Sequence, residues 1–121
     1  MTGSLGEALA ALRDSSGLLM ASVVGADGLV IEAAAEPGVD VESLSATAVS
    51  GLLMMDALAQ ELGEGAAKQA ILEYQSSVVA LTPLGDELLL VTVARDDANL
   101  GRLRLVIRRF VDQIASAVAA L

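Results

Sequence analysis

The sequence predicts an α+β protein, an α/β/α sandwich with helices on both faces of a five-stranded antiparallel sheet. Three observations support this fold class. Apolar residues recur at helical spacing at the start, in the middle and at the end of the chain. Two blocks rich in aliphatic and β-branched residues flank the middle helix, with Asp-Gly, Pro-Gly and Gly-Asp turn signals. Strands joined by short hairpins are typical of antiparallel sheets. The expected order is α-β-β-α-β-β-β-α.

The N-terminal part of the chain predicts a helix followed by a hairpin. Ser4 and Glu7 have the spacing of a capping box, so a helix should begin there and end near residues 15–17. Strands are expected at residues 18–24 and 29–35. The Asp-Gly pair between them predicts a two-residue hairpin turn in which both turn positions have positive φ.

The middle of the chain predicts a second, unusually apolar helix. Asp40 can cap it, and it should reach about Leu62. Its apolar positions cover more of the circumference than one sheet face requires, and no polar residue occurs from Gly51 to Met55. In a chain of 121 residues little protein remains to cover both sides of such a helix. A symmetric self-contact is therefore favoured over burial in a monomer core.

The C-terminal part predicts a second block of strands and a last helix. Strands are expected at residues 68–75, 77–83 and 87–94, the last two joined by a Gly-Asp turn. Asn99 is the nearest cap for a helix whose apolar residues follow an unbroken i, i+3, i+4 series to Leu121. This is the most regular pattern in the chain.

Composition excludes several classes of function. Hydrophobic residues make up 55% of the chain and charged residues 19%, which excludes disorder. There is no cysteine or histidine, so disulfides, thiol and imidazole catalysis and the usual zinc sites are absent. The net charge of −9 argues against nucleic acid and anionic membranes as partners. With neither a signal-peptide pattern nor a long apolar run, we expect a cytoplasmic protein without catalytic, cofactor or metal sites.

Two groups of charged residues remain to be explained. Carboxylates such as Asp27 and Asp86 lie in turn segments, and their spacing favours turn and capping roles over a metal or acid–base site. Four arginines lie in the first half of the last helix, where the helix dipole disfavours cations. We expect them to pair with acids of this chain, with contact to an acidic partner as the alternative. They are Arg102, Arg104, Arg108 and Arg109.

Four segments, taken in order, resemble the roadblock/LC7 family and, more narrowly, its bacterial MglB-like branch. They are a first hairpin at residues 24–30, a helix of small and aliphatic residues at 46–62, a last hairpin at 79–94, and the Asn-Leu-Gly that opens an arginine-rich helix at 99–101. The ordered set, rather than any one segment, is specific. The resemblance implies a single domain over residues 1–121 with the roadblock/LC7 fold, which is profilin-like.

The resemblance also implies how the chain associates with itself. In the family, third strands pair edge to edge and central helices pack across a dimer. Carried over, these elements are residues 68–75 and 44–62. The interface residues that we expect in a homodimer are Ala48, Gly51, Leu52, Met55, Leu58, Ala59, Ile71, Glu73 and Gln75.

A partner is implied by resemblance alone. Bacterial relatives work with small Ras-like GTPases of the MglA type without donating a catalytic residue. The leading hypothesis is therefore a non-catalytic homodimer that binds such a GTPase and modulates its activity. A dimerisation scaffold for signalling or motor components, independent of any GTPase, is the alternative. A domain that senses a small ligand is a third hypothesis, although the predicted strands offer few polar groups to hold one.

Overall fold

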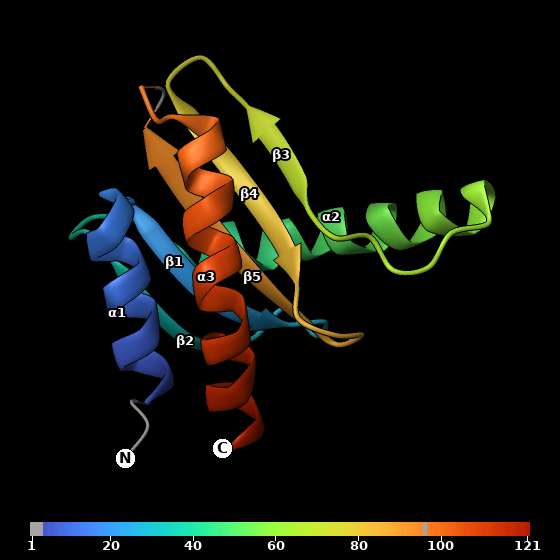
Figure 1. Ribbon diagram of the computed structural model, residues 1–121, viewed down its shortest axis with the longest axis horizontal. Coiled ribbons are helices and arrows are strands. Elements are labelled where there is room, and N and C mark those ends of the chain that lie inside the picture. The colour runs from blue at the N-terminus through green and yellow to red at the C-terminus, as the bar shows by residue number, and fades with distance from the viewer. Residues whose placement is uncertain (1–3, 96) are drawn as a thin grey trace.

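A computed structural model describes residues 4–95 and 97–121, which form three layers. Helices α1 and α3 cover one face of the sheet, and α2 lies across the other (Figure 1). The predicted fold class and element order are both confirmed. The elements are α1 Leu5–Ser16, β1 Met20–Gly25, β2 Val30–Ala35, α2 Val41–Leu62, β3 Ala70–Glu73, β4 Ser77–Pro83, β5 Leu88–Arg95 and α3 Leu100–Ala119.

The described strands form one antiparallel sheet in the order β2-β1-β5-β4-β3. The two hairpin blocks meet where β1 pairs with β5, in a register that sets Met20 opposite Val93. This long-range pairing places β2 and β3 at the two edges. The predicted edge position of the third strand is confirmed, but β3 spans Ala70–Glu73 rather than the expected residues 68–75.

The helix ends follow the predicted caps. The side chains of Ser4, Asp40 and Asn99 each accept a hydrogen bond from the backbone N–H three residues further on. Such caps satisfy N–H groups that have no partner inside the helix. Gly17 and Gly63 follow α1 and α2 in the left-handed conformation, which glycine adopts without steric cost. Gly63 therefore ends α2.

The turn between β1 and β2 differs from the prediction. Gly28 has positive φ, at 87°, but Asp27 does not. The Gly25 carbonyl accepts from the Gly28 N–H at 2.9 Å, and the Gly25 N–H donates to the Leu29 carbonyl at 3.0 Å. The loop therefore has three residues, a turn followed by a glycine bulge. The predicted two-residue turn was wrong because Ala26 also belongs to the loop, so that three residues separate Gly25 from its hydrogen-bonded partner Leu29.

Two apolar cores lie on opposite sides of the sheet. One fills the space under α1 and α3 and includes Leu9 and Ile107. The other lies under α2 and includes Leu52, Met55 and Leu89. Among the described helices, α2 alone is long and apolar enough to cross a membrane by length and composition. This is weak evidence for a span, because helices that pack on a protein core pass the same test.

A buried polar contact fixes the start of α2 on the sheet. The Oγ atoms of Ser22 on β1 and Ser45 on α2 lie 2.8 Å apart and share a hydrogen bond. Both residues are fully buried. A buried hydroxyl that loses its partner costs more than the bond itself contributes, so this pair constrains where α2 can lie.

We expect Ser45→Ala to lower the free energy of unfolding by about 1–3 kcal/mol, because it leaves the Ser22 hydroxyl buried without this partner. The double variant Ser22→Ala/Ser45→Ala should recover part of that loss, since both hydroxyls are gone. Urea denaturation measures the three free energies. This role would be contradicted if Ser45→Ala left the free energy of unfolding unchanged. It would also be contradicted if the double variant lost as much free energy of unfolding as the two single variants together.

Candidate functional site

Helix α2 is packed on the sheet over only part of its length. Its buried residues are Ser45, Val49, Leu52 and Met55. Beyond Met55 the helix continues to Leu62 and projects past the sheet on the β3 side (Figure 1). The expectation that this helix is buried on two sides is therefore not met within one copy of the chain.

An apolar seam runs along the whole of α2. Its members alternate at intervals of four and three residues, and they are Leu44, Ala48, Gly51, Met55, Leu58 and Leu62. This is the spacing that brings side chains into line for packing against a second helix. Small residues at the middle of the seam allow a close approach there. Leu52, which is 3% exposed, lies off the seam and packs on the sheet, whereas Met55 belongs both to the seam and to the buried side of the helix.

Two open hollows follow this seam. The first, of about 530 Å³, lies between the first half of α2 and the sheet. It is lined by Leu44, Ala48 and Gly51 from the helix and by Leu72, Val79 and Val93 from the strands. The second, of about 400 Å³, lies between the C-terminal end of α2 and residues 64–70, and is lined by Met55, Leu58 and Leu62. The α2 face thus presents continuous apolar surface to whatever covers it.

The structure divides the predicted interface residues of α2 into two groups. Leu52 and Met55 are 3% and 5% exposed and lie in the core of their own protomer. Leu58 is 54% exposed. Leu52 and Met55 therefore cannot report on self-association without disturbing the fold, whereas Leu58 can. Periodicity could not separate them, because apolar residues surround the middle of the helix.

Gly51, also predicted at the interface, has a role inside the protomer. A Cβ atom built on Gly51 would overlap Cδ1 of Leu81, a buried residue of β4. The missing side chain therefore lets α2 approach the sheet closely at this point. Gly51 and Leu81 also line the first hollow.

The β3 edge offers backbone groups for pairing. Within the described chain, β3 pairs with β4 on one side and with no strand on the other. Of the residues predicted on this edge, Ile71 is half-buried and Glu73 is exposed. Gln75 lies beyond the end of β3, so its expected place in the strand was wrong. The cause is a hairpin in which the Tyr74 N–H donates to the Ser77 carbonyl at 2.8 Å and ends the strand.

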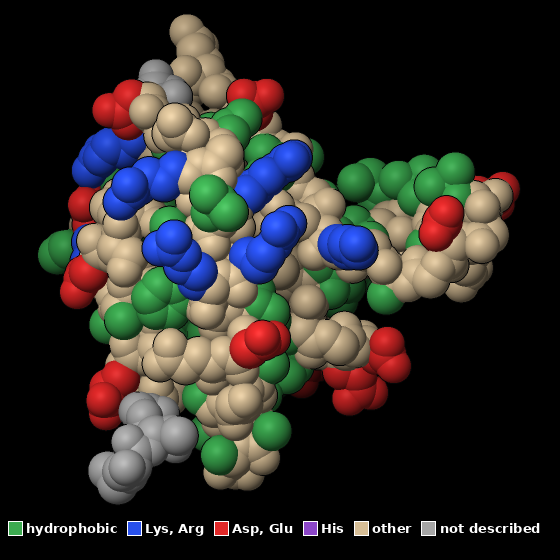
Figure 2. All heavy atoms as spheres, viewed as in Figure 1, with side chains coloured by type: hydrophobic (Ala, Val, Ile, Leu, Met, Phe, Trp, Pro, Cys, Tyr) green, Lys and Arg blue, Asp and Glu red, His purple; other side chains and the backbone are tan. Residues whose placement is uncertain are grey.

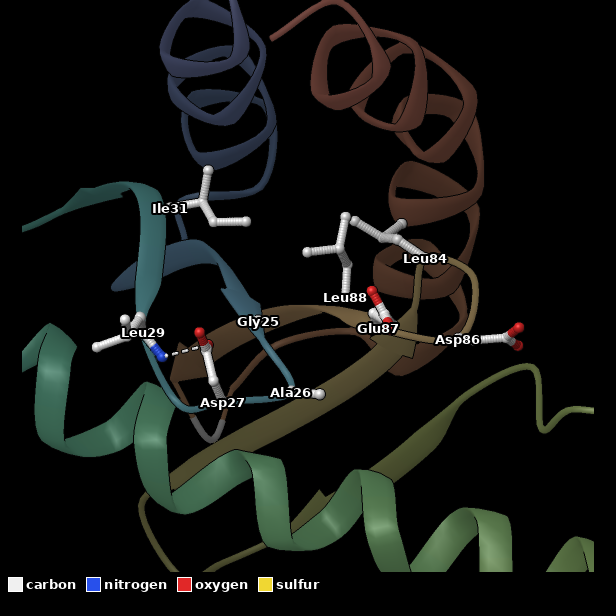
Figure 3. Close-up of a pocket in the computed structure, with 9 residues that line it drawn as sticks. All are labelled: Gly25, Ala26, Asp27, Leu29, Ile31, Leu84, Asp86, Glu87 and Leu88. Carbon is white, nitrogen blue, oxygen red and sulfur yellow. Dashed lines mark hydrogen bonds between the residues drawn. The ribbon is translucent and has the colours of Figure 1, made fainter.

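A third hollow, of about 1070 Å³, lies between the loops of the two hairpins (Figure 3). Asp27 accepts a hydrogen bond from the Leu29 N–H at 3.1 Å, which confirms its predicted turn role. Asp86 also lines this hollow, but its side chain points away from Asp27 (Figure 3). In residues 4–95 and 97–121, no group of three His, Cys, Asp or Glu residues could hold a metal ion. These carboxylates do not converge on a common centre.

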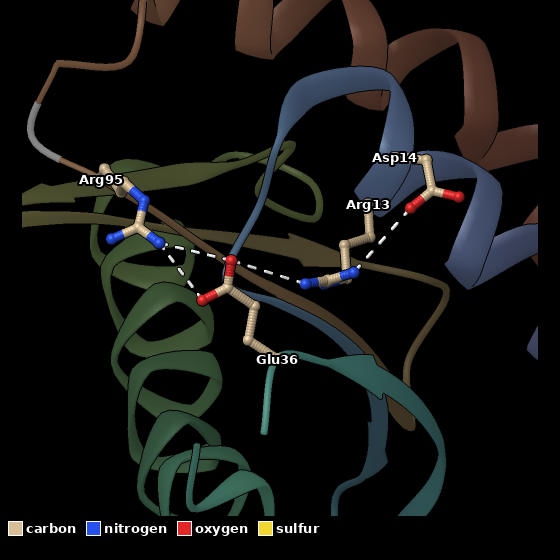
Figure 4. A network of polar contacts seen from close by, with 4 residues as sticks. All are labelled: Arg13, Asp14, Glu36 and Arg95. Atoms are coloured by element: carbon tan, nitrogen blue, oxygen red, sulfur yellow. Dashed lines mark hydrogen bonds and ion pairs between the residues drawn. The ribbon is translucent and has the colours of Figure 1, made fainter. Parts of the chain in front are cut away.

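Among residues 4–95 and 97–121, the arginines of α3 form none of the internal ion pairs that we expected. In the part of the chain that is described, the ion pairs belong to Arg13 and Arg95, which share Glu36, and Arg13 also lies near Asp14 (Figure 4). The α3 arginines are exposed, and Lys and Arg side chains gather on this face of the molecule (Figure 2). The expectation failed because no described carboxylate lies within 4.0 Å of their guanidinium groups.

Two of these arginines border a groove that the sequence did not predict. Arg104 and Arg108 line a hollow of about 320 Å³ together with Lys68, while Arg102 and Arg109 do not. The hollow lies between α3, the end of β4 and the segment that leads into β3. Nothing in the linear sequence could reveal it, because its two rims are far apart in the chain.

Comparisons with known proteins agree with this architecture. Residues 5–94 match the model of the Roadblock/LC7 domain family. An uncharacterized protein of Methanocaldococcus jannaschii is 30% identical over 103 residues, which cover 85% of this chain and 90% of the relative. MglB of Myxococcus xanthus superposes with a TM-score of 0.88 at 21% identity, over 97% of this chain and 96% of that chain. A Roadblock/LC7 domain from Streptomyces avermitilis superposes with a TM-score of 0.70 at 28% identity, over 93% and 99%.

The close approach at Gly51 can be tested by adding bulk. We expect Gly51→Val to lower the free energy of unfolding by about 1–3 kcal/mol through overpacking against Leu81, although valine favours helix more than glycine does. Ser50→Val, at an exposed position one residue earlier, should change it by about 0.5 kcal/mol or less. Chemical denaturation compares the two. Equal stabilities would show that α2 does not rest on β4 at this point.

Proposed function

The chain belongs to the roadblock/LC7 family, and from that premise we propose that it is a non-catalytic homodimeric docking module for a small Ras-like GTPase of the MglA type. In this proposal the dimer modulates the activity of the GTPase. The observation that carries the proposal is the open apolar seam of α2, which continues past the edge of its own sheet.

The shape of the α2 face supports the proposed self-association. Monomers rarely leave a contiguous apolar surface of this kind uncovered. The part of α2 beyond Met55 in one copy can lie against the hollow beside the first half of α2 in the other. A twofold axis then forms both contacts at once, because each copy offers the same two parts. The open edges of β3 can pair across the same axis and join the two sheets into one.

Binding of a GTPase is supported by the family resemblance. The resemblance to the MglB-like branch implies an MglA-type GTPase as partner, and the dimer would act on it by reshaping the switch elements of the GTPase itself. The surfaces described here are aliphatic side chains, strand-edge backbone and arginines, all of which suit contact with protein. A dimeric platform of this kind presents each surface twice.

Leu58→Asp should convert the dimer to a monomer in sedimentation experiments, because it buries an unpaired carboxylate in the seam. The matched control is Leu53→Asp on the same helix. Leu53 is 66% exposed but lies off the seam, so this variant should remain a dimer. Both variants should keep the unfolding cooperativity of a folded protein.

A native chain that sediments as a monomer at micromolar concentration would overturn the proposed dimer. A dimer that survives Leu58→Asp but is lost in Leu53→Asp would place the contact on the other side of α2. Either result can be interpreted, because Leu53 and Leu58 are exposed in the protomer and their substitution leaves its core packing intact.

GTPase binding is tested with purified small Ras-like GTPases from the source genome, each loaded with GDP or with a non-hydrolysable GTP analogue. Calorimetry should detect one that binds the native dimer, with an affinity that depends on the nucleotide. Hydrolysis assays then measure any change in its GTPase rate. If none of them binds a chain that is demonstrably dimeric, the GTPase-independent scaffold is the better account.

A further inference from the structure

We propose that the groove beside α3 binds an acidic, extended peptide segment of a partner protein. The groove is defined by Lys68 and Gln69 on one rim, Arg104 and Arg108 on the other, and Ile107, Val111 and Pro83 along its floor. It lies on the α3 side of the molecule, and one of its rims, formed by Lys68 and Gln69, also lines the second hollow beside the α2 seam. The inference does not depend on the proposed GTPase.

The charge of the groove opposes that of the whole chain. The chain has a net charge of −9, yet three cations surround this hollow and one acid, Asp112, lines it. In the described residues neither Arg104 nor Arg108 forms an ion pair, and Lys68 is exposed. Both arginines lie in the N-terminal half of α3. Negative charge from outside the chain would be stabilised here.

The shape of the groove selects an extended segment over a flat surface. Ile107 is fully buried, and Val111 and Pro83 are half-buried, so the floor is apolar. Beside it the Gln69 side-chain amide donates to Thr82 Oγ1 at 3.1 Å, which holds one rim against the sheet. A hollow of about 320 Å³ can take a few side chains of a peptide. Carboxylates would meet the two cationic rims while aliphatic side chains cover the floor.

Other anionic occupants fit these features less well. A membrane surface or a nucleic acid presents phosphates over a broad area, and the net charge of −9 repels both outside this one face. An acidic face of a second copy would have to insert a folded surface into a narrow hollow. A peptide with carboxylates and aliphatic residues in alternation satisfies rims and floor together.

Fluorescence anisotropy with a labelled synthetic peptide of alternating glutamate and leucine tests the proposal on the native chain. Binding should saturate and weaken as salt rises, because exposed charges are screened. The double variant Arg104→Glu/Arg108→Glu should weaken it about tenfold, as two favourable pairs become repulsive. Arg102→Glu/Arg109→Glu changes the net charge equally outside the groove, and should weaken it by about twofold or less.

Equal weakening by both double variants would overturn the groove, because it would show only a general effect of net charge. Equal binding of a lysine–leucine peptide would also overturn it. Tight binding to phosphatidylserine vesicles without binding to the peptide would overturn the proposal and indicate a membrane surface as the occupant. Higher oligomers of the native chain that Arg104→Glu/Arg108→Glu abolishes would overturn it in favour of a second copy. Sedimentation and urea unfolding of both variants confirm that fold and self-association are retained, which separates this test from that of the dimer.

Discussion

The packing of α2 on the sheet only as far as Met55 is the contact on which the other surfaces depend. The helix has 22 residues, roughly 33 Å at 1.5 Å per residue. The Ser22–Ser45 hydrogen bond fixes its start, and the missing side chain of Gly51 lets it descend onto β4. Beyond Met55 the helix leaves the sheet. Its last two turns then project into solvent with leucines exposed.

The sheet separates two surfaces of different chemistry. The α2 face is apolar and has an open strand edge beside it, which suits contact with a second copy. The α3 face is basic in a very acidic chain, which suits contact with carboxylates of another protein. Both surfaces border the segment between α2 and β3, since Lys68 and Gln69 line the second hollow of the seam as well as the α3 groove. One short segment therefore joins the two proposed sites.

Local chemistry made much of the fold predictable. Caps at Ser4, Asp40 and Asn99 gave the helix starts, and the turn signals gave strands close to those observed. The turn at Asp27 was mistaken because loop length depends on which residues pair across the hairpin, and that pairing is not local. The sequence could not predict which side of α2 meets the sheet, because Leu52 and Leu58 are the same residue type in one apolar run, yet only Leu52 is buried. The α3 groove required β4 and α3 to be placed in space.

The central claim is that a second copy of the chain covers the part of α2 that projects beyond Met55. Hydrogen exchange of the backbone amides at residues 55–62, followed across a wide range of protein concentration, tests it most directly. Binding stabilises the state that it selects, so association should slow exchange in this segment as concentration rises. Amides in the strands of the central sheet should change less. Exchange at residues 55–62 that is fast and independent of concentration would contradict the account.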